Sequence, residues 1–432
     1  MNILKFVSTS LLLFVALTCG AGAKETAVEA KKVAKEAVVE AKEAAKEAVA
    51  GAKETAVEAK KVAKELAVAA KEVVTREKQF SPEIQEKLQT KMESLIKEIN
   101  APGFNVGIWI PGEGEWHNSF GVADKETAEK MSLDKHFRIG SITKTFVTTA
   151  LLQLVDKGEI SLDDKISKYI DNVPNGDEIT IRQLANMTSG LANYSEDEEW
   201  VKTSIFTKSD RNIPVSELLD VAFKIAPAFA PGKGWHYSNT NTILLGQVIE
   251  KISGLSLDQY LQENIFTPLG LSDTSYPLDA KMPSPYAHGY TKQTLDGKEA
   301  DVTFNNPSWT NAAGQMVSNF ADLKIWAKAL GTGALLSDNA FKERLSWVTL
   351  PPNTEKRKYG LGVGANNGWI THTGSLPGYN CVVAYLPEKQ AVLVVTINSD
   401  IDLVVKGKNV ALTDMVFEAV TKIITPDNVP IR

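Results

Sequence analysis

The chain has 432 residues, of which 43% are apolar and 23% are charged, and its formal net charge is −6. This length and composition predict a globular protein with one large domain or two moderate ones, and the lack of a basic excess argues against nucleic acid as a partner. Two cysteines, five histidines, and the absence of HExxH and paired CxxC motifs give no basis for a metal site or a cofactor.

Residues 1–23 have the features of a secretory signal peptide: a positive start at Lys5, an apolar run over Phe6–Leu17 and a small-residue cleavage signal at 21–23. The apolar run is short for a membrane span, so we expect cleavage after residue 23 and export to the periplasm or the medium. A lipid anchor at Cys19 is the less favoured alternative. After cleavage only Cys381 remains, which excludes an intrachain disulfide.

The segment 24–78 is rich in alanine, lysine and glutamate and contains a repeat. The residues GAKETAVEAKKVAKE at 22–36 recur at 51–65, and the alanines step by three and four residues. This composition predicts a helix from intrinsic propensity, and we interpret the segment as a semi-rigid spacer. Because an alanine stripe buries little area, weak self-association ranks second and membrane-surface binding third.

Residues 79–432 are predicted to form the globular domain. Helical and strand patterns frame it in chain order: a helix within 81–99, two strands within 103–124, three strands within 368–399 and a closing helix within 410–424. The stretch from roughly 142 to 350 has mostly helical patterns broken by loops. We therefore predict an α/β fold in which one antiparallel sheet is flanked by helices and carries an inserted, mostly helical subdomain. The cleft between sheet and subdomain is the expected site.

A serine and a lysine stand together where the helical middle begins. In FRIGSITKTF, Ser141 and Lys144 are three residues apart and so share one face of the predicted helix. A partly desolvated lysine can act as the base that activates a serine hydroxyl, and the backbone N–H of Ser141 can stabilise an oxyanion. Two further SxxK patterns, Ser94 with Lys97 and Ser132 with Lys135, lack the strand–Gly–Ser entry and are interpreted as coincidences.

Two more motifs follow in order. Tyr237-Ser238-Asn239 precedes an apolar helix, and His372-Thr373-Gly374 lies on a strand. The order SxxK, YxN, HTG resembles the serine β-lactamase and DD-peptidase superfamily, and specifically its D-alanyl-D-alanine carboxypeptidase branch with class C-like architecture. The resemblance runs from about residue 95 to about residue 425.

The resemblance implies three catalytic residues. Ser141 would be the nucleophile, and Lys144 would accept its proton or tune Tyr237. Tyr237 would pass a proton to the leaving group and help water to attack the acyl-enzyme.

The resemblance also implies the residues that bind the substrate. Asn239 would hydrogen-bond the substrate amide and Lys144, and His372 and Thr373 would contact the carboxylate side of the substrate. The backbone N–H groups of Ser141 and Ser375 would form the oxyanion hole, and Gly374 would let the strand approach the substrate closely.

The sequence departs from this family pattern in three places. His372 stands where class C β-lactamases have lysine, and a neutral imidazole attracts a carboxylate less, which argues against efficient β-lactam hydrolysis. Met187 stands where relatives often have histidine. No motif identifies an arginine that would bind a peptide carboxylate, and Arg357 is a candidate only because it lies near the HTG motif in the sequence.

We expect an exported serine hydrolase that acts on small peptides. The favoured activity is that of a D-alanyl-D-alanine carboxypeptidase, or of a related D-peptidase, on peptidoglycan-type peptides. A class C-like β-lactamase is one alternative, and an esterase or D-aminopeptidase on the same fold is another. A binding protein without activity is a further one, but the intact motif set argues against it. The same acyl chemistry serves peptides, β-lactams and esters, so the sequence does not separate them.

Overall fold

The computed structural model describes residues 78–431 apart from 100, 208, 351–354 and 406. The chain divides into two units after Lys78, and the second, Gln79–Arg432, is the one described below. The predicted signal peptide at 1–23 and nearly all of the predicted spacer at 24–78 lie outside the described residues and stay predictions. None of the helices that are described is both long and apolar enough to cross a membrane.

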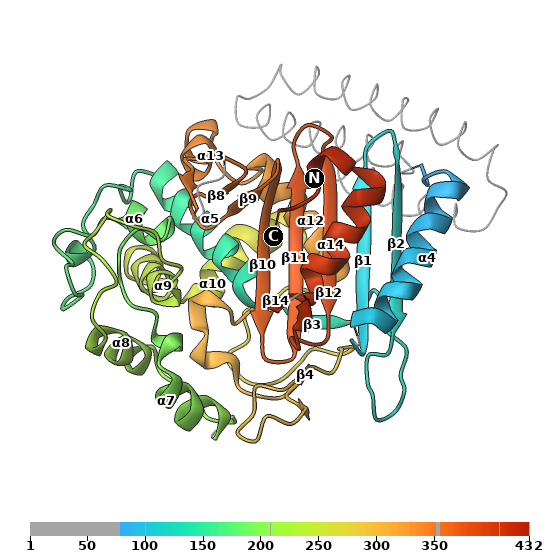
Figure 1. Ribbon diagram of the computed structural model, residues 1–432. Coiled ribbons are helices and arrows are strands. Elements are labelled where there is room, and N and C mark those ends of the chain that lie inside the picture. Colours follow the sequence, from blue (N-terminus) through green and yellow to red (C-terminus); the bar gives the residue numbers. More distant parts are fainter. Residues whose placement is uncertain (1–77, 100, 208, 351–354, 406, 432) are drawn as a thin grey trace, which may run out of the picture. The chain divides into compact units, whose positions relative to one another are not determined.

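One antiparallel sheet organises the described part of the chain (Figure 1). Its eight strands run in the order β2-β1-β12-β11-β10-β9-β8-β7. Their bounds are β1 Gly103–Ile110, β2 Gly114–Gly121, β7 Val348–Thr349, β8 Arg357–Tyr359, β9 Gly364–Asn366, β10 Trp369–Leu376, β11 Tyr379–Leu386 and β12 Ala391–Ile397. The predicted strands at 103–124 and 368–399 therefore join in one sheet, although they come from opposite ends of the domain.

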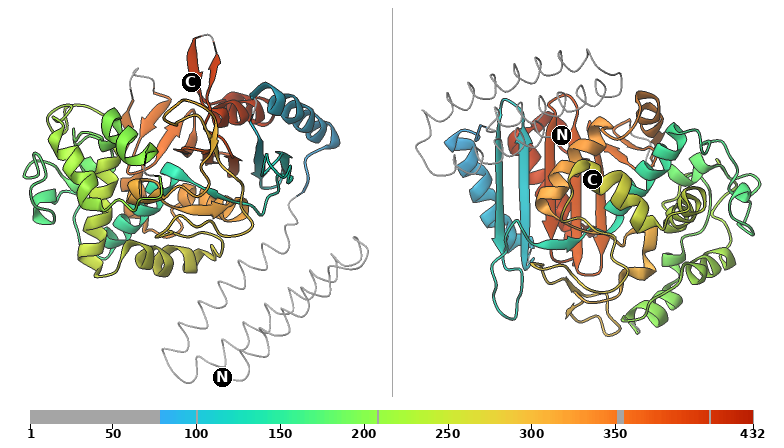
Figure 2. Two further views of the ribbon diagram at one scale, coloured as in Figure 1. Left: turned by 90° about the horizontal axis from the view of Figure 1, so that it is seen from below. Right: turned by 180° about the vertical axis from the view of Figure 1, so that it is seen from behind.

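Both faces of this sheet are covered. Helices α4 (Pro82–Ile99) and α14 (Leu412–Ile424) pack together on one face, and α12 (Phe320–Thr332) packs on the other, as the views in Figure 2 show. Alternate residues of β11 enter two different hydrophobic clusters. This coverage explains why all eight residues of β1 are buried and why the central strands are almost continuously apolar.

A mostly helical region stands beside the sheet, on the side of β10 (Figure 1). Its helices are α5 Thr143–Asp156, α6 Ile181–Ala185, α7 Glu198–Trp200, α8 Val215–Lys224, α9 Asn239–Ser253, α10 Leu257–Leu261, α11 Thr267–Leu269 and α13 Asp338–Arg344. Helix α5 is buried along most of its length and packs against α9 and α10. The predicted fold, an antiparallel sheet with helices and a helical insertion, is confirmed.

Three small two-stranded ladders complete the described fold. They pair β3 (His136–Arg138) with β6 (Val317–Asn319), β4 (Tyr290–Thr291) with β5 (Ala300–Asp301), and β13 (Leu403–Val405) with β14 (Lys408–Val410). The β3–β6 ladder leads the chain directly to Ser141. The β4–β5 hairpin carries Gln293, which also reaches the site described next.

Candidate active site

Ser141 lies on a tight turn between a strand and a buried helix. Strand β3 ends at Arg138, the 3₁₀ turn η2 covers Gly140–Ile142, and α5 begins at Thr143. Gly140 has φ +50°, a left-handed conformation that glycine adopts without a steric cost. A Cβ at Gly140 would also lie 2.8 Å from the backbone nitrogen of Ser375 on β10. Glycine therefore allows the turn to press against β10.

Lys144 contacts Ser141 from the first turn of α5, as the i, i+3 spacing predicts. Its Nζ lies 2.9 Å from Ser141 Oγ and donates a second hydrogen bond to the carbonyl oxygen of Ala313 at 2.8 Å. The side chain is fully buried, and this burial holds the pKa of Lys144 well below its usual range. Because burial disfavours the charged ammonium, Lys144 loses its proton more readily than an exposed lysine, and the amine lone pair can then accept the proton of Ser141.

Tyr237 lies against the same pair. Lys144 Nζ is 4.9 Å from the centre of the Tyr237 ring. Burial raises the pKa of the Tyr237 hydroxyl above its usual value, and a side-chain hydrogen bond with Ser141 opposes this only in part. The phenol therefore stays protonated at neutral pH, where it can donate a proton but cannot serve as a phenolate base.

Asn239 is close to Ser141 but bonds to different residues from those expected. Its Nδ2 donates to Ser195 Oγ at 2.9 Å, and its backbone nitrogen donates to Asn193 Oδ1 at 3.2 Å. The expectation of a hydrogen bond between Asn239 and Lys144 is wrong for the described residues, because Lys144 is bound to Ser141 and Ala313. Ser195, which the sequence did not single out, holds the Asn239 amide instead.

Strand β10 forms the opposite wall and alternates along its length. Thr373 and Ser375 are exposed, while His372 and Gly374 are buried. A Cβ at Gly374 would lie 1.9 Å from the carbonyl oxygen of Ile139 and 3.3 Å from the backbone nitrogen of Ser141. Gly374 thus permits close contact between β10 and the serine turn. This contact brings the backbone of Ser375 next to that of Ser141, as the predicted oxyanion hole requires.

His372 is locked in one neutral form. Its Nδ1 lies 2.6 Å from the backbone oxygen of Thr373, so Nδ1 must carry the hydrogen, and Nε2 accepts from the Tyr359 hydroxyl at 3.1 Å. Burial, followed by the charge of Lys144, lowers the pKa of His372 to about 4. The imidazole is therefore neutral at pH 7, and both of its nitrogens are already engaged.

The remaining residues that depart from the family pattern have structural surroundings of their own. Met187 is buried with φ +66°, and its Sδ accepts a hydrogen bond from Asn241 Nδ2 at 3.2 Å. Arg357 begins β8, two strands away from β10 in the sheet. It does not line the cleft at Ser141.

Ser141 opens into a cleft of about 250 Å³. Its described lining combines polar groups around the serine with an apolar wall, and includes no lysine, arginine, histidine or carboxylate: Ser141, Ser195, Val201, Ile205, Phe206, Asn239, Gln293, Trp309, Thr310, Ala313, Gly314, Ser375, Leu376 and Pro377. The apolar wall comes from the π-helix η5 (Val201–Phe206) and from Trp309. Among the described residues no cluster of His, Cys, Asp or Glu side chains could hold a metal ion.

The family model described as Beta-lactamase matches residues 88–413, a span that includes the serine turn, the YSN segment and the HTG strand. The chain belongs to the beta-lactamase family. Its members here include both penicillin-binding proteins and D-amino-acid amidases, so the match shows a serine hydrolase and leaves the substrate open.

Three relatives of this beta-lactamase-family protein show that range. Penicillin-binding protein 4* of Bacillus subtilis is 27% identical over 349 residues, covering 73% of this chain and 72% of that protein. A D-stereospecific amidohydrolase from Streptomyces sp. has 31% identity and a TM-score of 0.67, covering 73% of this chain and 94% of that one. A D-amino acid amidase from Ochrobactrum anthropi has 26% identity and a TM-score of 0.69, covering 79% and 99%.

The two other SxxK patterns have ordinary surroundings in this beta-lactamase-family fold. Ser94 is exposed on α4. Ser132 Oγ donates to Asp134, and Lys135 is paired with Glu129. Only Ser141 combines a buried lysine with a cleft among these three serines.

Proposed function

We propose that this hydrolase cleaves amide bonds formed by D-amino acids, in D-amino-acid amides and small D-peptides, through an acyl-enzyme on Ser141. The contact of buried Lys144 with Ser141 carries the proposal. Lys144 accepts the hydroxyl proton as Ser141 Oγ attacks the carbonyl carbon, and the N–H groups of Ser141 and Ser375 bind the oxyanion. Tyr237 then donates a proton to the leaving amine and regains one from the protonated Lys144. A water molecule next attacks the acyl-enzyme and gives its proton to Lys144, which returns it to Ser141 Oγ as the acid leaves.

The lining of the cleft supports an apolar acyl group. Val201, Ile205, Phe206 and Trp309 give one wall of side chains that can cover an aliphatic or aromatic substituent. Burying such a side chain contributes about 1.5–3 kcal/mol. The D configuration is supported by two of the relatives, which are named as a D-stereospecific amidohydrolase and a D-amino acid amidase.

A D-alanyl-D-alanine carboxypeptidase acting on peptidoglycan-type peptides is the second candidate. The penicillin-binding relatives favour it. A carboxypeptidase must bind a free carboxylate, yet the described lining of the cleft has no cationic side chain, and His372 is neutral with both nitrogens engaged. For this reason we rank the amidase first, and the carboxypeptidase, the β-lactamase and the esterase remain alternatives for the same test.

The test compares substrates on one purified protein. D-phenylalanine amide, L-phenylalanine amide, a D-Ala-D-Ala peptide and a chromogenic cephalosporin are assayed side by side. We expect the D-amide to be turned over faster than the L-amide. We expect the chromogenic cephalosporin to be turned over slowly. Fast cephalosporin turnover with no amide hydrolysis would replace the proposal with a β-lactamase, and selective D-alanine release would replace it with a carboxypeptidase.

Three serine variants assign the nucleophile. Ser141→Ala is expected to abolish both turnover and labelling by a fluorophosphonate probe, because no other described serine has a buried lysine as its base. Ser94→Ala and Ser132→Ala are matched controls from the other SxxK patterns and should leave labelling unchanged. Labelling that survives in Ser141→Ala would remove Ser141 from the mechanism.

A further inference from the structure

The rim of the cleft contains a glutamine whose orientation is fixed from behind. Gln293 lines the cleft together with Ser141 and Ser375, and it comes from the β4–β5 hairpin. Its Nε2 donates to Asp400 Oδ2. Because an ionised carboxylate only accepts hydrogen bonds, the amide nitrogen of Gln293 must face Asp400. The amide oxygen, Oε1, has no hydrogen-bond partner within the described residues and is left as an acceptor.

Asp400 is a buried carboxylate without a cationic partner in the described structure. It is 9% exposed, and its Oδ1 accepts from the backbone nitrogen of Gly378 at 2.9 Å. Thr291 and Gln293 supply its side-chain donors, both of them neutral. Asp402 lies near enough for the charge of Asp400 to raise the pKa of Asp402 further, after burial has raised it.

This arrangement gives the rim a definite polarity. The charge on Asp400 is solvated by neutral donors and stays uncompensated, and no cationic side chain lines the cleft among the described residues. A negative charge behind a neutral acceptor attracts an ammonium group and repels a carboxylate. Gln293 relays this polarity, because its amide dipole points with the oxygen end away from Asp400.

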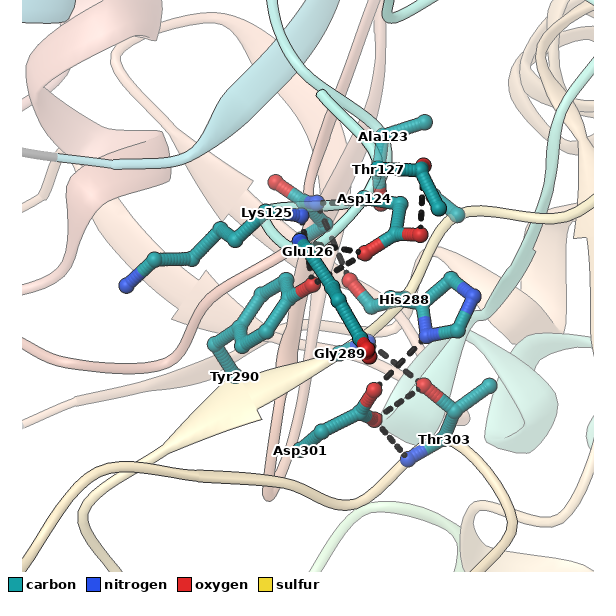
Figure 3. Close-up of polar contacts among 12 residues, drawn as sticks. Ala123, Asp124, Lys125, Glu126, Thr127, His288, Gly289, Tyr290, Asp301 and Thr303 are labelled. Carbon is teal, nitrogen blue, oxygen red and sulfur yellow. Dashed lines mark hydrogen bonds and ion pairs between the residues drawn. The ribbon is translucent and has the colours of Figure 1, made fainter. Parts of the chain in front are cut away.

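The hairpin that carries Gln293 is held at its base, and the exposed side chain of Gln293 is itself held by its hydrogen bond to Asp400. Figure 3 shows the network: Tyr290 Oη donates to Asp124 Oδ1 at 3.2 Å, and His288 Nδ1 lies 2.6 Å from Asp301 Oδ2. These contacts tie both strands of the hairpin to each other and to the loop at 123–127. A fixed acceptor loses little conformational entropy when a substrate binds.

We propose that Gln293, oriented by Asp400, accepts a hydrogen bond from a free α-ammonium group on the acyl part of the substrate, and that this pair makes the enzyme select substrates with an unblocked amino terminus. The inference rests on the proposed function, because it takes the acyl part to be an amino acid. It adds the group that is recognised and the two residues that recognise it. Gln293 contacts the substrate, and Asp400 is a positioning residue.

The experiment compares two chromogenic substrates that differ in one group. D-phenylalanine p-nitroanilide has a free amine, and N-acetyl-D-phenylalanine p-nitroanilide has a blocked one. The assay is run below the pKa of an α-amino group, about 7.7–8.0, so that the free amine is charged. The full-length protein is expected to prefer the free amine, mainly through a lower KM. A preference for the acetylated substrate would overturn the proposal.

Two variants test the pair. Gln293→Leu should lower the ratio of kcat/KM for free over acetylated substrate by at least about tenfold, since a site built around one hydrogen bond discriminates strongly when that bond is lost. Asp400→Asn should act in the same direction. The loss in Gln293→Leu should be larger for the free-amine substrate, mainly through a higher KM, than for the acetylated one, because only the free-amine substrate has an ammonium group to bind. A ratio that is unchanged in Gln293→Leu would overturn the proposal.

A matched control removes a different charge from the same hairpin. Asp296 is exposed, pairs with Lys298 and does not line the cleft, so Asp296→Asn should leave the ratio unchanged. If Asp296→Asn lowers the kcat/KM ratio as much as Gln293→Leu does, the preference is due to the general charge of the surface, and the proposal is overturned. If Asp400→Asn fails to fold because the turn at Gly378 depends on it, Gln293→Leu at the exposed rim still decides the result.

A separate readout covers failure of the proposed function. If neither anilide is hydrolysed, protection of Ser141 from the fluorophosphonate probe is measured with D-phenylalanine amide and with its N-acetyl derivative. If the free amine protects Ser141 at a lower concentration than the acetylated compound, and Gln293→Leu abolishes this difference, the role of Gln293 is supported even though the proposed hydrolysis fails. Equal protection by both compounds, in both proteins, would overturn the inference about Gln293.

Discussion

His372 shows how burial keeps a histidine side chain uncharged, even though its hydrogen bond to the backbone of Thr373 favours the protonated form. The carbonyl of Thr373 requires a hydrogen on Nδ1, and the Tyr359 hydroxyl occupies Nε2. Protonation would turn Nε2 from an acceptor into a donor that faces the Tyr359 hydroxyl, and would add a cation near Lys144. A second buried cation would also favour loss of the proton from Lys144, but at the cost of an unpaired charge in the core. The neutral imidazole avoids this cost, and burial of Lys144 itself lowers the pKa of that amine.

The buried neutral imidazole predicts a specific loss of stability in acid. An unfolded histidine binds its proton near pH 6.5, whereas His372 in the fold binds it only near pH 4. Between these values the unfolded state binds more protons, so the free energy of unfolding falls as pH falls. The contribution is fully present above pH 6.5, and about 3 kcal/mol of it is lost by pH 4.

His372→Gln is the matched variant for this prediction, because glutamine does not titrate. Denaturant unfolding at pH 7 and at pH 4 measures how much the free energy of unfolding falls in each protein. Since all other titratable groups are the same in both, the difference between the two falls reports on His372. We expect the native protein to lose about 3 kcal/mol more than His372→Gln over this interval. Parallel pH dependence in the two proteins would show that His372 is protonated in the fold as readily as in the unfolded chain.

Some residues of the site could be predicted from short sequence motifs, and others are brought to the site only by the three-dimensional fold. Ser141, Lys144 and Tyr237 belong to short motifs whose order could be recognised from the sequence alone. Ser195 reaches the cleft from the 3₁₀ helix η4 (Tyr194–Glu196) and Gln293 from the β4–β5 hairpin, and the positions of both depend on long-range packing. Tyr359 contacts His372 only because β8, β9 and β10 are neighbours in the sheet, and this pairing cannot be predicted from a local sequence pattern.

At the scale of elements, the site depends on how closely one strand and one turn approach each other. The backbone of β10 lies against η2 at Gly374 and Gly140, where a Cβ would meet backbone atoms at 1.9 Å and 2.8 Å. Backbone atoms cannot move aside as a side-chain tip can. The two glycines therefore set the spacing between the Ser141 and Ser375 N–H groups.

Gly374→Ala should separate β10 from η2. We expect the rate of Ser141 acylation to fall by about 100-fold, as for loss of one oxyanion donor, and stability to fall by about 1–3 kcal/mol through overpacking. Gly364→Ala is the control on the neighbouring strand β9, where the nearest atom to a Cβ would be 3.2 Å away. The measurements are fluorophosphonate labelling rate and denaturant unfolding. A folded Gly374→Ala protein that is labelled at the native rate would contradict this role for the contact.

The elements themselves were predictable where the apolar pattern is long. The helix at 81–99, the two strands within 103–124, the three strands within 368–399 and the closing helix are confirmed as α4, β1–β2, β10–β12 and α14. The edge strands β7, β8 and β9 were not predicted. Each has only two or three residues, too few to show a period of two, and each is defined by its neighbour and not by its own sequence.

At the scale of the whole molecule, the core of the described unit lies on both sides of the central sheet. The sheet separates two hydrophobic clusters, one with α4 and α14 and one with α5, α9 and α12. Ser141 belongs to the second side, between Ile139 and Ile142, which are both fully buried. The first cluster includes Phe80, only two residues after the described part of the chain begins.

This arrangement predicts where the chain can be shortened. A protein comprising residues 79–432 keeps every predicted site residue, keeps Phe80 in the core and keeps its backbone hydrogen bond to Glu115 at 3.3 Å. We expect it to fold and to hydrolyse its substrate with kcat/KM within about twofold of the longer protein, a difference of about 0.4 kcal/mol. Shortening to residue 101 also removes α4, including Leu88 and Met92, which are fully buried.

The two truncations have opposite expected outcomes, so together they locate the boundary. Loss of two fully buried apolar side chains costs about 2–5 kcal/mol each, and the sheet face under α4 would be opened to water as well. The shorter protein should therefore lose its cooperative unfolding transition and its Ser141 labelling. Circular dichroism during thermal unfolding and fluorophosphonate labelling measure both. A 79–432 protein with a tenfold lower kcat/KM but a normal unfolding transition would show that the preceding residues take part in the reaction, in conflict with their predicted role as a spacer.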